Sequence, residues 1–172
     1  LTVGHGLSAR RYTASLVTGK FFSLLGVKPE LGRLFGPAED EPGAPGIVVI
    51  SHAVWQNDFG GVPHVVGRTI DFGHGQYVIT GVAPQGFTGM DLARVDMWLP
   101  LRVTNSQLWS SWQWVDNRNM NWLRVVARLA PGVSVQAADA EATLLHRQGR
   151  AEQIGERKYD AKARIIATPL IS

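Results

Sequence analysis

The stretch ARRYTASLVTGKFFSLLG, residues 9–26, sets the fold class. Apolar and polar side chains alternate over residues 10–17, which is the period of a half-buried β-strand. Thr18 follows as a helix N-cap, and the next residues give a short helix one apolar side. Gly26 is placed to end that helix in the left-handed conformation. The stretch therefore predicts a strand followed directly by a short helix.

The same elements return near the other end of the chain. Residues 123–129 alternate, Ser134 is placed to cap a helix with apolar residues at spacings of three and four, and residues 161–167 alternate again. A crossover of this length joins parallel neighbours. We therefore expect the two strands to pair side by side, with the helix on one face.

The middle of the chain has a mainly β pattern. Residues 27–45 are rich in Pro and Gly and predict a boundary loop. Ile47 to Ile50 predict a buried strand that ends at Ser51, the N-cap of a helix. Residues 68–72 and 76–82 predict a hairpin, and residues 96–101 a further strand. The predicted fold class is α+β: one α/β subdomain from residues 1–35 and 106–172, interrupted by a β-rich insertion of residues 36–105.

Composition excludes several classes of protein. The 172 residues suffice for one domain or two small ones. Seventeen Lys and Arg against 14 Asp and Glu leave a net charge of +3, which does not indicate a nucleic-acid partner. The absence of cysteine excludes disulfides, thiolate metal sites and Cys nucleophiles. No apolar run has the length of a membrane helix, and no signal peptide opens the sequence.

The sequence gives little support for a cofactor-binding or metal-binding site. Gly4, Gly6 and Ala9 have the spacing of a dinucleotide-binding loop, but a strand follows where that loop needs a helix. The five histidines are scattered singly, so neither a metal nor another cofactor is predicted. The acidic triplet at residues 39–41 lacks the ligand pattern of a calcium loop. We interpret the triplet as solvated loop charge.

A hydrolase is one alternative function. Ser51, His52 and Asp58 are the residue types of a catalytic triad. They lie in one short helical segment, however, whereas triads are assembled from separate elements beside an oxyanion hole. A helix start with a capping serine is the favoured interpretation.

A nucleic-acid-binding sheet is a second alternative. Five basic residues fall on the face of the predicted sheet that no helix covers: Arg11, Arg124, Arg128, Lys162 and Arg164. Binding of single-stranded RNA on such a face also needs aromatic side chains on the central strands, and only Trp122 comes close. Spaced basic residues equally keep an open sheet soluble.

Residues 107–122 contain four of the six tryptophans and show neither the helical nor the strand period, which predicts a loop. Core filling accounts for at least two of these indoles, while interfaces draw on exposed aromatic anchors. We predict that Trp109, Trp112 or Trp114 is partly exposed and contacts a partner.

Short stretches of the sequence, in order, resemble the signature of the MacB-like periplasmic core domain of ABC transporter permeases. They are VTGKFFSLLGVKP (17–29) with LGRLF (31–35), VISH (49–52) with Trp55 and FGG (59–61), VVGRTI (65–70), YVITGVAP (77–84) with Gly86 and Phe87, DMWLPL (96–101), and RLAPGVS (128–134). The resemblance covers about residues 14–168. The sequence departs from the family pattern around Pro63. An acidic residue before this proline is commoner in the family, whereas Val62 and His64 flank it here.

The resemblance implies an ectodomain on the periplasmic side of the inner membrane, between the first and second membrane helices of a permease. Its fold would be a porter-like α/β subdomain, lacking an opening helix and strand upstream of residue 1, with an inserted β-rich subdomain. Such a domain is non-catalytic and transmits ATP-driven conformational change. The implied partners are a second copy of the ectodomain, an ATPase subunit or domain acting through the membrane region, and cargo or a periplasmic adaptor.

Overall fold

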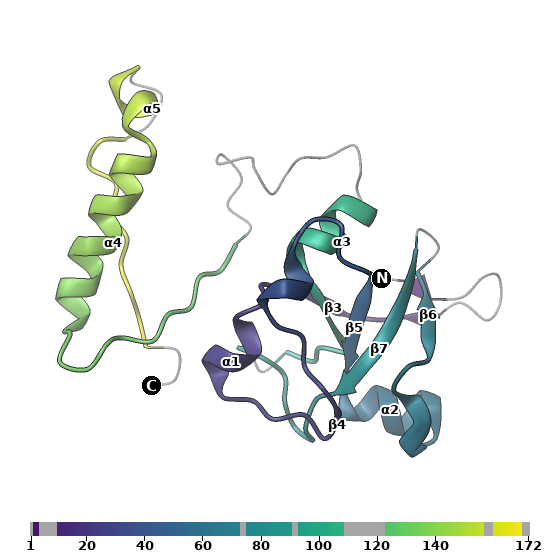
Figure 1. Cartoon of the computed structure of the whole chain (residues 1–172). Coiled ribbons are helices and arrows are strands. Elements are labelled where there is room, and N and C mark those ends of the chain that lie inside the picture. The colour runs from purple at the N-terminus through teal and green to yellow at the C-terminus, as the bar shows by residue number, and fades with distance from the viewer. Residues whose placement is uncertain are drawn as a thin grey trace. The chain divides into compact units, whose positions relative to one another are not determined.

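The protein, described from a computed structural model over residues 2–3, 10–72, 75–90, 93–108, 123–156 and 160–169, has two compact units. Unit 1 spans residues 1–122 and unit 2 spans residues 123–172 (Figure 1). None of the helices in the described part of the chain has the length and apolar content that crossing a bilayer requires.

Unit 1 is built on one mixed sheet. Its strands are β3 (Ala14–Val17), β4 (Leu31–Gly32), β5 (Ile47–Ile50), β6 (Thr69–Asp71), β7 (Gln76–Val82) and β8 (Met97–Pro100). The strand order is β3-β8-β5-β7-β4, and β6 also pairs with β7. β3 runs parallel to β8 and β5 runs parallel to β7, whereas β5 and β8 are antiparallel. A separate small ribbon joins β1 (Thr2–Val3) to β2 (Arg10–Arg11).

Helices connect the strands of this sheet. Unit 1 contains α1 (Phe21–Leu25), α2 (His52–Phe59) and α3 (Leu101–Leu108), with the short 3-10 turns η2 (Pro37–Asp40) and η3 (Pro63–Val65). Two predicted helix ends are confirmed, since Ser51 accepts a hydrogen bond from the Val54 N–H at the start of α2 and Gly26 ends α1 with a φ of 69°. The predicted N-cap at Thr18 is wrong, because α1 begins after Lys20, whose side chain makes no cap hydrogen bond. The predicted hairpin is also confirmed, because β6 and β7 pair antiparallel.

Both faces of the sheet in unit 1 are buried. Val48 and Ile50 of β5 point into a cluster with Val54 and Trp55 of α2, while Ile47 and Val49 point into a second cluster with Phe22 of α1. β8 divides in the same way, since Met97 and Leu99 join the first cluster and Trp98 the second. A strand buried on both faces is apolar at every position, which explains the unbroken IVVI run.

The predicted separation of a β-rich insertion at residue 36 is wrong. β3, from the stretch 1–35, pairs with β8, from the stretch 36–105, and both belong to one sheet. The chain divides near residue 122 instead, so residues 1–35 are not grouped with residues 123–172. The reason is a parallel pairing between strands about 80 residues apart, which no local pattern specifies.

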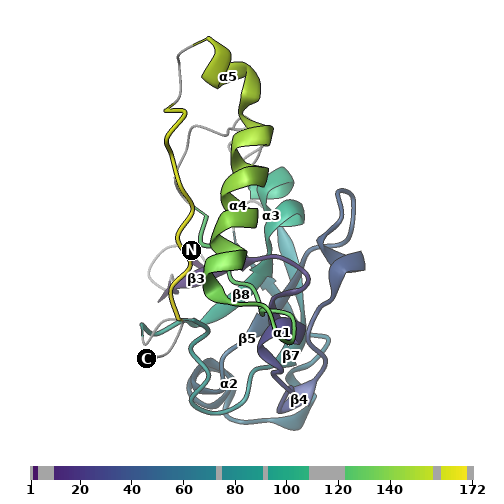
Figure 2. The same ribbon diagram turned by 90° about the vertical axis from the view of Figure 1, so that its left-hand side faces the viewer.

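The described residues of unit 2 form helix α4 (Val135–Gly149), helix α5 (Ala151–Gly155) and two extended segments. Ser134 caps α4 as predicted, accepting a hydrogen bond from the Ala137 N–H at 3.1 Å. The segment at residues 163–167 runs along α4 (Figure 2). Its alternate residues bind side chains spaced by four along the helix: Ala167 N–H donates to Asp139, Ile165 N–H donates to Thr143, and the Arg147 side chain donates to the Ala163 carbonyl.

The predicted pairing of residues 123–129 with residues 161–167 is not formed. Neither segment is a strand in the described residues of unit 2. One edge of the second segment is occupied by the side chains of α4, and large apolar residues of both segments are exposed, Val125 at 89 % and Ile166 at 73 %. An alternating pattern marks a segment that can form a strand, but the pairing partner decides whether it does.

Candidate functional site

The residues of the hydrolase alternative do not form a triad. The Ser51 hydroxyl caps α2, and the His52 Nδ1 lies 2.7 Å from Oε2 of Glu30. Asp58 is at the far end of α2, where it binds Tyr12 and Arg10. Each of the three side chains is engaged with a different structural partner, so the geometry contradicts this alternative.

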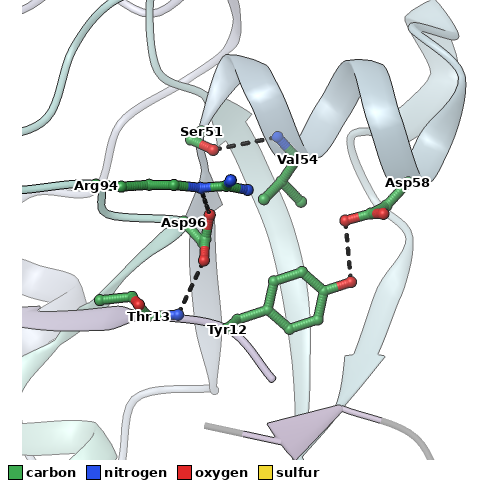
Figure 3. Close-up of polar contacts among 7 residues, drawn as sticks. All are labelled: Tyr12, Thr13, Ser51, Val54, Asp58, Arg94 and Asp96. Carbon is green, nitrogen blue, oxygen red and sulfur yellow. Dashed lines mark hydrogen bonds and ion pairs between the residues drawn. The ribbon is translucent and has the colours of Figure 1, made fainter. Parts of the chain in front are cut away.

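Asp58 joins α2 to the segment before β3. The Tyr12 hydroxyl donates to its Oδ2 across 3.0 Å (Figure 3). The Arg10 guanidinium forms an ion pair with its Oδ1. Partial burial and the neighbouring carboxylate both raise the pKa of Tyr12 above its ordinary value of 10.0. This contact is structural, because it fixes the approach of the chain to the sheet.

Asp96 holds the start of the β3–β8 pair. Its side chain is buried, with Oδ2 accepting the Thr13 N–H at 2.9 Å and Oδ1 accepting from Arg94 at 2.8 Å (Figure 3). Its backbone N–H also donates to the Thr13 carbonyl, and its own carbonyl accepts from Ser51. Asp96 thus connects the entry points of three neighbouring strand and helix elements.

Asp40 holds the opposite end of the same strand pair. The carboxylate is 5 % exposed, and it accepts the Gly19 N–H at 3.1 Å and the Arg102 N–H at 2.8 Å. Gly19 follows β3 and Arg102 follows β8. Two buried carboxylates therefore bracket the parallel pair, one at each end.

The interpretation of the acidic triplet as solvated loop charge is wrong for the buried Asp40, whereas Glu41 is exposed. Glu39 accepts the Gly36 N–H at 2.7 Å and forms an ion pair with Arg33, while Glu41 pairs with the Arg102 side chain at 2.9 Å. Asp40 between them is buried. Sequence reasoning missed these roles because the main partners of Asp40 are backbone N–H groups, which every residue except proline carries. The available signal was Pro37 followed by acidic residues, which is typical of a helical turn start.

The basic residues of the nucleic-acid alternative do not share a sheet. Arg11 lies in β2 of unit 1, whereas Arg124, Arg128, Lys162 and Arg164 lie in extended segments of unit 2 that are not strands. The structure thus contradicts a common basic sheet face. Among the described residues, no group of three His, Asp or Glu side chains is placed to hold a metal ion.

Other predicted residues lie outside the described part of the chain. These are Trp109, Trp112, Trp114 and Trp122 of the tryptophan-rich segment, and Gly4, Gly6 and Ala9 of the glycine spacing.

Comparison with known proteins identifies the class. The family model of the MacB-like periplasmic core domain matches residues 2–145. A search of curated proteins gave no significant match. The periplasmic region of MacB from Actinobacillus actinomycetemcomitans is similar with a TM-score of 0.60 and 14 % identity, over 94 % of this chain and 72 % of that one. A domain of a putative permease from Porphyromonas gingivalis has a TM-score of 0.51 and 20 % identity, over 85 % of this chain and 63 % of that one. At such identities, the solved structures show a shared fold.

The chain belongs to the family of MacB-like periplasmic core domains, which are non-catalytic domains on the periplasmic or extracellular side of ABC transporter permeases. The family match confirms the resemblance seen in the sequence.

Proposed function

We propose that this domain transmits the ATP-driven conformational change of its permease to the outer side of the membrane. The observation that carries the proposal is the division of the chain into two compact units. Rigid-body movement of one unit against another is a common way for proteins to transmit a conformational change. The double-sided burial of the sheet supports this role, because a well-packed body moves as a whole.

The partners follow from this role. ATP hydrolysis would be supplied by an ATPase subunit or domain acting through the membrane region of an inner-membrane permease. A second copy of this domain would lie on the same periplasmic side, and cargo or a periplasmic adaptor would contact one or both copies.

Distances between engineered cysteines test the proposal in the intact transporter. The chain has no cysteine of its own, so spin labels at Asn57→Cys in unit 1 and Glu141→Cys in unit 2 are the only labelled sites within these 172 residues. Both positions are exposed. We expect the distance distribution to shift between the nucleotide-free and ATP-bound transporter.

The matched control is a pair of labels at Asn57→Cys and Lys28→Cys, both exposed and both in unit 1. Its distance should not depend on nucleotide, because the two positions belong to one compact unit. An unchanged distance between units, or equal shifts in both pairs, would contradict transmission by relative movement.

A contact role for Trp109, Trp112 and Trp114 is a second part of the proposal. Its support is compositional, since indole side chains supply large contact area at low entropic cost. A photo-crosslinking residue placed at position 112 of the intact permease should yield adducts with a second copy, an adaptor or cargo. Trp55, buried in the core of unit 1, gives the control position, which should yield none. Equal yields from the two positions would remove this assignment.

A further inference from the structure

The acidic triplet contacts the place where the chain leaves the sheet of unit 1. β8 ends at Pro100 and α3 begins at Leu101, so the strand continues into the helix without a connecting residue. α3 ends at Leu108, and the chain continues from there toward unit 2. α3 is therefore the last described element of unit 1 before the connection.

The start of α3 is held by a residue from far back in the chain. The first N–H groups of a helix have no partner within the helix and carry its partial positive charge. Asp40, 62 residues earlier, accepts the Arg102 N–H at 2.8 Å with Oδ1. Glu41 adds an ion pair with the side chain of the same arginine at 2.9 Å. Two consecutive acidic residues thus bind the same residue of α3, one through its backbone N–H and the other through its side chain.

The other oxygen of Asp40 is bound to β3. Gly19, two residues after β3 ends, donates its N–H to Oδ2 at 3.1 Å. β3 and β8 are parallel, with Val17 opposite Pro100, so their ends lie side by side. One buried carboxylate therefore bridges the exit of β3 and the start of α3. Each N–H group is bound by a different oxygen, so an amide in its place would turn its NH2 group, which is a donor, toward one of the two N–H groups.

The turn that carries Asp40 packs closely against the residues that follow β3. A Cβ added to Gly19 would lie 2.5 Å from the Cα of Pro37 and 2.6 Å from the carbonyl oxygen of Gly36, so the two backbones are in close contact. Glu39 closes the turn onto the Gly36 N–H. Asp40 consequently has a fixed position from which to hold α3.

We propose that Asp40 and Glu41 form a coupling latch, through which displacement of the chain beyond α3 acts on the paired ends of β3 and β8. The inference rests on the proposed transmission function and names the residues that pass the movement into unit 1. Without the latch, α3 would separate from η2 and absorb the displacement itself.

Hydrogen exchange of the 172-residue chain tests whether the latch holds α3. We expect Asp40→Asn to speed amide exchange of residues 103–108 by about tenfold or more, because the buried negative charge at the helix start is lost and one of the two N–H groups faces a donor in place of an acceptor. Exchange in β5 and β7 should be unchanged. The matched control is Asp96→Asn, which removes a second buried carboxylate at the other end of the strand pair and should leave α3 exchange unchanged.

Glu41→Gln provides a second test of the same contact if Asp40→Asn does not fold. It removes only the exposed ion pair with Arg102, and it should speed α3 exchange by about twofold to threefold, in keeping with the small value of surface ion pairs. Unchanged α3 exchange in the folded variant, or an equal increase in Asp96→Asn, would overturn the latch.

The intact transporter separates this inference from the function on which it rests. With labels at Asn57→Cys and Glu141→Cys, Asp40→Asn should reduce the ATP-dependent distance shift while ATP turnover continues. A full shift in Asp40→Asn would overturn the latch and leave the proposed function standing. No shift in the otherwise unaltered labelled transporter would overturn the proposed function, and the exchange measurement would still decide whether Asp40 holds α3.

Discussion

The hydroxyl of Tyr12 donates a hydrogen bond to Oδ2 of Asp58 across 3.0 Å, and the two residues are 46 positions apart in the sequence. The contact ties the segment entering β3 to the last turn of α2. Its effect on Tyr12 gives a pH dependence of stability, since burial and the nearby carboxylate raise the pKa of the phenol above 10.0 in the folded state.

Tyr12→Phe should weaken this dependence. Below pH 10 the phenol is neutral in both states, and its contribution to the free energy of unfolding is fully present. Above pH 10 the unfolded chain ionises first, so stability falls as pH rises toward the folded-state pKa. We expect the variant to lose about 1 kcal/mol at pH 7 through the missing hydrogen bond, and to show a smaller further loss between pH 9 and 11. Urea unfolding at pH 7, 9 and 11 measures the two effects, and an unchanged pH slope would contradict the assignment.

Tyr77→Phe should behave differently. The Tyr77 hydroxyl is buried without a hydrogen-bond partner among the described residues, and so is the hydroxyl of Thr104. Burial raises the pKa of Tyr77, and the Thr104 side chain lowers it by a smaller amount. The two hydroxyls nevertheless do not form a hydrogen bond with each other. Removing an unpaired buried hydroxyl removes its desolvation penalty, so the variant should be neutral or up to about 1 kcal/mol more stable. Thermal unfolding at pH 7 checks this, and a clear loss of stability would show that the hydroxyl is bound.

Gly81→Ala should be severely destabilising. Gly81 lies in β7, and a Cβ there would overlap the carbonyl oxygen of Arg33 and approach that of Leu31 at 2.9 Å. Backbone atoms of the neighbouring β4 region cannot move aside as a side chain can, so we expect a loss of about 3 kcal/mol or more. Gly26→Ala is the control, because its φ of 69° is strained for alanine but open space surrounds it. That variant should lose about 1–2 kcal/mol, and equal losses in the two variants would contradict the steric argument.

Ser51→Ala and His52→Ala separate a helix cap from a catalytic role. The serine variant should lose about 1 kcal/mol of stability, as expected for an N-cap. The histidine variant removes a half-buried contact with Glu30 and should change stability by about 1 kcal/mol at most. Neither variant should alter hydrolysis of ester, peptide or phosphate probes, which the unaltered chain should not cleave either. Turnover that is lost with His52 would contradict this interpretation.

Local features of unit 1 were predictable from sequence. Ser51 and Gly26 act on their own neighbourhood, so their roles follow from residue type and position. The hairpin of β6 and β7 was also predictable, because its two strands are adjacent in the chain. The family resemblance rests on the same local motifs.

Long-range pairing was not predictable in this way. The assignment of β3 and β8 to one sheet depends on a contact between distant segments, and the apolar run of β5 does not reveal which strands flank it. The two carboxylates that bracket β3 and β8 were missed for the same reason. Asp40 and Asp96 bind backbone groups that become neighbours only after the sheet has formed.

The series of hydrogen bonds between α4 and residues 163–167 can contain only a few members. Four residues of an α-helix advance about 6.0 Å and two residues of an extended segment about 6.6 Å, so successive rungs drift apart by about 0.6 Å. Three rungs tolerate this mismatch, whereas a longer series would leave the range of a hydrogen bond. Continuing the spacing of four would reach Val135, the first residue of α4, and Ala151, which lies beyond α4 at the start of α5, and neither side chain donates or accepts hydrogen bonds. The sequence therefore stops the series close to the point at which the geometry would end it.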